Sequence, residues 1–104
     1  MTVDIQRVLE ELVGRSIPTM TGKPNRVLGL SGTTVIVGTN RSPTGRPVDI
    51  AAVQDAADDL FRRGELEISK ATVGYRSAFV GAVLASLPGT VAETKPRRIR
   101  LETR

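Results

Sequence analysis

The sequence predicts an α+β fold: a small antiparallel sheet of three to four strands, with a central hairpin, packed against three helices. Three observations carry this prediction. Three segments place apolar residues at helical spacing, two neighbouring β-rich runs flank a Ser-Gly pair, and one later run alternates strictly between acidic and apolar residues. The expected element order is α-β-β-α-β-α, and a last strand near the C-terminus is left open.

The first predicted helix covers residues 3–13. Its apolar residues recur at the i, i+3, i+4, i+7 and i+8 spacing of one buried helix face; they are Ile5, Val8, Leu9, Leu12 and Val13. Thr2 is the expected N-cap and Gly14 the expected stop. Asp4 lies where the helix dipole favours a negative charge.

A β-hairpin is predicted from two runs, 26–30 and 33–37, which residues 31–32 (Ser-Gly) join. Gly29 interrupts the first run and is expected at a β-bulge. The unbroken apolar run Val35–Val37 predicts a central strand with both faces covered.

Two turn-rich segments flank the hairpin. Before it, residues 19–21 are a candidate short strand and residues 22–25 a turn by composition. After it, residues 41–49 are predicted to form a stiff loop, because their two prolines fix φ and their glycine can take a positive φ. This loop is expected to present Arg41 and Arg46.

An amphipathic helix is predicted over residues 50–63. Asp49 is its expected N-cap, and Gly64 is its expected C-terminal stop. Residues 65–69 alternate between outward and inward positions, which predicts a half-buried strand.

A third helix, predicted over residues 75–87, is apolar on most faces, which is typical of a helix in the middle of a domain. A stripe of small residues suited to close packing runs along it: Ser77, Gly81 and Ala85. We expect one domain over residues 1–92. Residues 93–104 are expected to form a basic tail or linker, or an edge strand.

Composition excludes several classes of function. The chain of 104 residues contains no cysteine and no histidine, so thiolate nucleophiles, cysteine zinc sites and histidine general bases are all missing. We therefore expect no enzyme activity of its own, no cofactor and no metal site. No apolar run reaches about 18 residues and the N-terminus lacks a signal-peptide pattern, which predicts a cytoplasmic protein without membrane contact.

Positive charge is segregated along the chain. The net charge is +4, but residues 14–48 carry five bases and no acid, whereas residues 49–72 carry six acids and three bases. If the five bases of residues 14–48 also lie close together in space, they form a patch suited to phosphate. If they scatter, or pair with the acids of 49–72, they only keep the protein soluble. The sequence leaves both interpretations open.

Three stretches, 14–28, 41–48 and 74–84, together resemble the N-terminal head domain of McrA-like type IV restriction endonucleases. The resemblance covers residues 10–90. Members of that family are multidomain enzymes that cut methylated or phosphorothioated DNA with an HNH nuclease domain near the C-terminus. An HNH site needs histidines, and this chain has none. The resemblance therefore implies a non-catalytic accessory module that acts with a nuclease domain in cis or in trans.

The expected partner is double-stranded DNA, with or without a modification. The residues expected to contact it lie in two turns and at the start of the third helix: Thr21, Lys23, Asn25, Arg26, Arg41, Arg46, Arg76 and Ser77. Tyr75 is a candidate for stacking on a base, and its more ordinary role is a position in the core or at its rim. A second hypothesis is a protein-interaction or dimerisation module, with a possible homodimer and no direct DNA contact.

Overall fold

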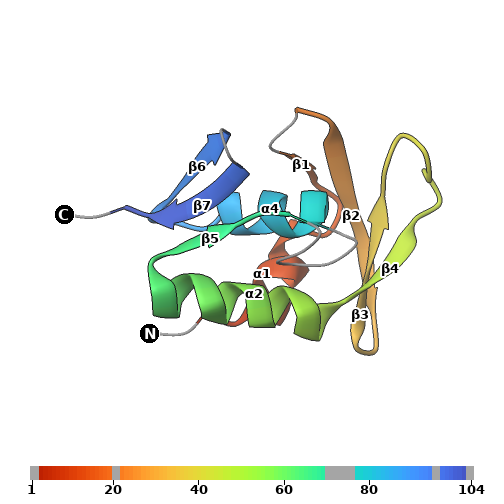
Figure 1. The fold of residues 1–104 in the computed structure, drawn as a ribbon. Helices are drawn as coiled ribbons and strands as arrows, with labels where there is room; N and C mark the ends of the chain where they lie inside the picture. The colour runs from red at the N-terminus through yellow and green to blue at the C-terminus, as the bar shows by residue number, and fades with distance from the viewer. Residues whose placement is uncertain (1–2, 20–21, 70–76, 95–96, 103–104) are drawn as a thin grey trace.

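The computed structural model describes residues 3–19, 22–69, 77–94 and 97–102 (Figure 1). Its helices are α1 (Ile5–Leu12), α2 (Ile50–Arg63) and α4 (Ser77–Ala85). Its strands are β1 (Ser16–Pro18), β2 (Pro24–Ser31), β3 (Thr34–Gly38), β4 (Arg46–Asp49), β5 (Glu65–Glu67), β6 (Thr90–Thr94) and β7 (Arg97–Leu101). The predicted α+β class is confirmed.

The described strands form two antiparallel sheets rather than one. The first sheet has the order β1-β2-β3-β4, and the second has the order β5-β7-β6. In Figure 1, α4 lies in the middle of the molecule, and it contacts β1 of the first sheet as well as β6 and β7 of the second. The first sheet matches the predicted small sheet with a central hairpin, and a second sheet is added because the C-terminal segment folds into a hairpin that pairs with β5.

The predicted hairpin is confirmed as β2 and β3. Ser31 pairs with Thr34, so the two-residue turn begins at Gly32, one position later than expected. The register shifts between Val27 and Gly29, which confirms the predicted bulge. β3 is an interior strand of its sheet, as its apolar run predicts.

The segment before the hairpin differs from the prediction. The described strand there is β1, in which Ile17 buries its side chain while pairing with Asn25. Residues 20 and 21 of the predicted strand 19–21 lie outside the described residues. Residues 24 and 25 belong to β2 and not to the turn. The Thr19 amide nitrogen donates to the Lys23 carbonyl at 3.0 Å, and this bond closes the turn between the two strands.

Half of the predicted basic loop is a strand. Residues 46–49 form β4, which pairs with β3 and lies at the edge of the first sheet. Pro47 is compatible with this position because an edge strand has one side whose N–H groups need no partner in the sheet. Val48 is buried opposite Val35, so hydrophobic burial holds the strand in place.

The first helix is shorter than predicted. It begins at Ile5, and its N-cap is Asp4, whose carboxylate accepts a hydrogen bond from the Arg7 amide at 3.4 Å. The proposed cap Thr2 lies outside the described residues. Val13 is 42% exposed and lies beyond the helix, because the helix ends at Leu12 and only its inward face packs on the core.

The second helix has the predicted bounds and both predicted end signals. The Asp49 carboxylate accepts a hydrogen bond from the Ala51 amide at 3.0 Å. Gly64 ends the helix with φ of 85° and donates its N–H to the Leu60 carbonyl. None of the described helices is long and apolar enough to cross a membrane.

The C-terminal segment is part of the second sheet. The expectation of a tail or an edge strand is wrong for β7, because this strand lies between β5 and β6. Ile99 at its centre is fully buried. On the other face, two arginines form salt bridges. Arg98 Nη1 lies 3.0 Å from Oε2 of Glu65, and Arg100 Nε lies 3.3 Å from Oε2 of Glu93. The alternation of inward and outward residues explains why so basic a segment enters a sheet.

The third predicted helix is α4, and its first two predicted positions, 75 and 76, lie outside the described residues. Phe79 is 2% exposed and belongs to the core, whereas Phe61 on α2 is half-buried against it. In the stripe of small residues, Gly81 is buried, whereas Ser77 and Ala85 are half-buried.

Candidate functional site

The loop between β3 and β4, residues 39–45, is held by hydrogen bonds within itself. The Thr39 amide donates to the Ser42 carbonyl at 3.1 Å, and the Ser42 amide donates back to the Thr39 carbonyl at 3.2 Å. The Ser42 amide also reaches the Thr39 hydroxyl at 3.0 Å. Gly45 then donates its N–H to the Ser42 carbonyl at 3.0 Å. These bonds position Arg41 between two anchored residues.

Gly45 lets this loop lie against the first sheet. Its φ is 97°, and an added Cβ would lie 2.5 Å from Cγ2 of Ile36 and 2.9 Å from Cδ1 of Leu28. A glycine is therefore required both by the backbone conformation and by the close approach. The loop covers the outer face of β3 at Ile36, which is half-buried there.

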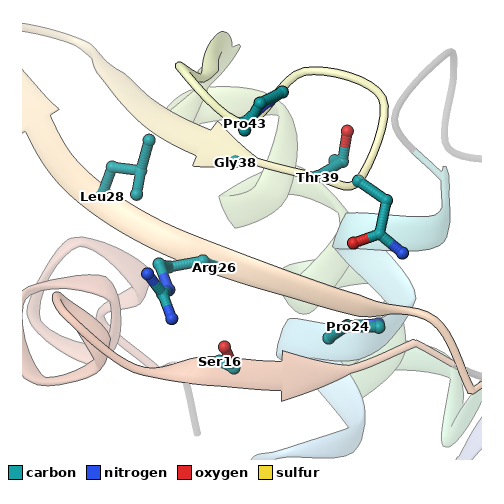
Figure 2. A pocket seen from close by; sticks show the side chains of 8 residues that line it. Ser16, Pro24, Arg26, Leu28, Gly38, Thr39 and Pro43 are labelled. Carbon is teal, nitrogen blue, oxygen red and sulfur yellow. The ribbon is translucent and has the colours of Figure 1, made fainter.

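The surface around the loop is hollowed on the outer face of the sheet. We call this the outer hollow; its volume is about 210 Å³. Its lining includes Ser16 of β1, Arg26 of β2 and Pro43 of the loop. Figure 2 shows the Arg26 side chain directed toward the β1 side of the hollow, with Pro43 beside Gly38.

Two further hollows adjoin it around the ends of β2 and β3. The Asn25 hollow, of about 270 Å³, is lined by Thr19, Lys23, Pro24, Asn25, Thr39, Asn40, Arg41 and Ala78. The α4 hollow, of about 110 Å³, is lined by Asn25, Val37, Thr39, Ser42, Arg46, Ala78 and Phe79. Thr39 at the end of β3 lines all three hollows: the outer hollow lies on the outer face of the first sheet, and the other two include core-side residues of β2 and β3. We call the three hollows together the connected surface.

Four cationic side chains gather on this surface: Lys23, Arg26, Arg41 and Arg46. All four residues are exposed, and none of the described residues that line the three hollows is acidic. Within the described ranges, the ion pairs of the protein involve other arginines. The four charges are therefore open to a ligand, and the alternative that they pair with the acids of 49–72 finds no support in this part of the chain.

Asn25 has a different place in the surface. It is only 7% exposed and lies on the core side of β2, yet it lines both the Asn25 hollow and the α4 hollow. Its side-chain amide makes no hydrogen bond to the described residues. No fully buried side-chain nitrogen or oxygen there lacks a partner, so the polar atoms of this amide must reach solvent through the hollows.

The structure brings five of the nine predicted contact residues together on the connected surface: Lys23, Asn25, Arg26, Arg41 and Arg46. Ser77 is half-buried as the first residue of α4 and lines none of the three hollows. The other three predicted residues, Thr21, Tyr75 and Arg76, lie outside the described residues.

Two lining residues were missed by the sequence reasoning, namely Thr39 and Asn40. Both have polar side chains, and they stand directly between the apolar run of β3 and the basic loop. A polar pair at the end of a buried strand is a signal that could have placed them at the site, because binding residues concentrate on loops that a rigid scaffold positions.

The connected surface offers hydrogen-bond donors and positive charge; the chain has no histidine or cysteine, and the described lining residues include no carboxylate for acid–base or nucleophilic chemistry. It is equipped to bind an anion. No family model, no curated protein and no solved structure matches this chain.

Proposed function

We propose that this protein is a non-catalytic DNA-binding module that contacts the phosphate backbone of a duplex. The observation that carries the proposal is that Lys23, Arg26, Arg41 and Arg46 surround hollows whose described lining residues include no acid. Phosphate contacts provide most of the affinity in sequence-independent binding, and they come from arginine, lysine and short polar side chains.

The elements that present these cations support the proposal. Arg26 lies on β2 and Arg46 on β4, and both of these strands pair with β3. Lys23 precedes β2, and its carbonyl accepts a hydrogen bond from the Thr19 amide. The Arg46 Nε also donates to the Ser42 hydroxyl at 3.2 Å, which orients its guanidinium over the loop. Cations held in this way lose less conformational entropy on binding than cations on free side chains.

The resemblance to McrA-like head domains extends the proposal. Under it, the module would help a nuclease domain, in cis or in trans, to capture methylated or phosphorothioated DNA. Among the described residues, the lining of the Asn25 hollow includes no aromatic side chain, and base flipping needs stacking partners. Backbone contact is therefore the mode that we propose.

The test is fluorescence anisotropy of the protein with labelled duplexes. Plain, 5-methylcytosine and phosphorothioate duplexes are each titrated at several salt concentrations. We expect binding that weakens steeply with salt, and we expect Arg41→Ala/Arg46→Ala to lower both the affinity and the salt slope, by about one unit of slope for each lost contact. A difference among the duplexes would report recognition of a modification.

The matched control is Arg7→Ala/Arg63→Ala, which removes the same charge from two exposed arginines on α1 and α2. If both double variants weaken binding equally, general charge and not the site attracts DNA, and the proposal fails. If the wild-type protein binds no duplex at low salt, DNA contact is refuted, and self-association or binding to another protein becomes the function to test.

A further inference from the structure

Asn25 lies in a position where a buried polar group is costly. Its neighbours along β2 on the same face include the fully buried Val27, and the α4 residue Phe79 adjoins it in the α4 hollow. The Asn25 amide has no hydrogen-bond partner among the described residues, and its polar atoms reach solvent only through the hollows. A largely buried polar group without a protein partner is explained by water, a bound ion or a functional role.

Several donors converge with Asn25 on the same hollow. Lys23 and Arg41 carry only donors and a positive charge. The Thr39 hydroxyl already accepts a hydrogen bond from the Ser42 amide, so its own hydrogen is free to point into the hollow. Ala78 of α4 also lines this hollow.

This set of groups selects an anion and not a neutral molecule. Two of the donors are charged, and the described lining residues include neither an acid nor an aromatic ring on which a base could stack. A phosphate group presents several acceptor oxygens at once, which suits an amide, a hydroxyl and two cations that surround one space.

We infer that the Asn25 hollow is a subsite for a single phosphate group, in which the Asn25 amide donates to a phosphate oxygen while Lys23 and Arg41 neutralise the charge. The inference deepens the proposed function and rests on it for the source of the phosphate, the backbone of a DNA duplex. The same chemistry would accept free inorganic phosphate, and the experiment separates the two sources.

Two variants test the role of Asn25. Asn25→Leu replaces the amide by an apolar side chain of similar size, and Asn25→Asp places a carboxylate among the cations. We expect Asn25→Leu to bind a plain duplex about tenfold more weakly, which corresponds to one lost hydrogen bond to a charged group. Its salt slope should equal that of the wild type, because no charge is removed.

The stability of the same proteins provides an independent readout. We expect Asn25→Leu to raise the Tm by several degrees, because an apolar side chain takes the place of a largely buried amide that only water satisfies. Inorganic phosphate, compared with chloride at equal ionic strength, should raise the Tm of the wild type and leave both variants unchanged. A higher Tm of Asn25→Leu together with weaker duplex binding would show that Asn25 serves binding and not the stability of the fold.

The outcomes separate the inference from the proposed function. If both variants bind duplex as the wild type does, while Arg41→Ala/Arg46→Ala does not, the phosphate subsite is refuted and DNA binding stands. If phosphate stabilises only the wild type but no duplex binds, the subsite holds free phosphate and DNA binding is refuted. If Asn25→Leu does not fold, the Asn25→Asp variant provides the test. Duplex affinity in Asn25→Asp equal to that of the wild type would refute the phosphate subsite.

Discussion

Replacing Gly45 by alanine should destabilise the protein more than its exposure suggests. The residue has a φ of 97°, which side chains with a Cβ rarely adopt. The new Cβ would also lie 2.5 Å from Cγ2 of Ile36 and 2.9 Å from Cδ1 of Leu28. Leu28 is 36% exposed and can turn away, but Ile36 is β-branched and stiff at χ1, so the loop or the strand must move.

The expected loss of unfolding free energy in Gly45→Ala has two contributions. A left-handed backbone conformation costs a residue with a Cβ about 1–2 kcal/mol. Relief of the overlap with Ile36 costs a further 1–3 kcal/mol, roughly the price of forcing one extra methyl group into a packed site. We therefore expect Gly45→Ala to lower the free energy of unfolding by about 2–5 kcal/mol.

Urea unfolding followed by circular dichroism measures this loss, and Gly14→Ala is its matched control. Gly14 has a φ of 85°, but an added Cβ there meets nothing within 4 Å. The backbone strain and the effect on the unfolded chain are similar at both positions, so the difference between the two variants isolates the overlap. Equal losses in the two variants would refute the close packing of the loop on Ile36.

Two further predictions use the same unfolding assay. Asp49→Ala should lower the free energy of unfolding by about 1 kcal/mol, because it removes the cap that accepts from the Ala51 amide at 3.0 Å. Asp55→Ala, an exposed position on the same helix, should change it by less than about 0.5 kcal/mol, and an equal loss there would contradict the capping role. Ile99→Ala should cost about 2–5 kcal/mol, because Ile99 is fully buried in the middle strand of the second sheet. Arg97→Ala, exposed on the same strand, is the control, and a wild-type midpoint for Ile99→Ala would mean that β7 does not belong to the folded core.

Elements that local chemistry encodes could be predicted from the sequence. The helix at 50–63 has the predicted bounds because Asp49 and Gly64 satisfy its ends with atoms only a few residues away. The hairpin and the bulge at Gly29 followed for the same reason, since a two-residue turn joins strands that are neighbours in the chain.

Elements that depend on distant pairing could not be predicted in this way. Residues 46–49 look like a loop because they contain proline, and they become a strand only through pairing with residues 34–37. Residues 97–101 look like a basic tail, and they become a middle strand because β5 and β6 lie on either side. The strands with which these two segments pair cannot be identified from the local sequence pattern.

For the candidate site too, some features follow from the sequence and others depend on the tertiary structure. The sequence alone determined that residues 14–48 carry bases without acids, which is a fact of composition. Only the tertiary structure decided that Lys23 and Arg41 face one hollow, because β2 and β3 bring a turn and a loop to the same end of the sheet. The burial of Asn25 was decided there too, since alternation along a strand puts a residue on one face but packing against α4 determines whether that face is covered.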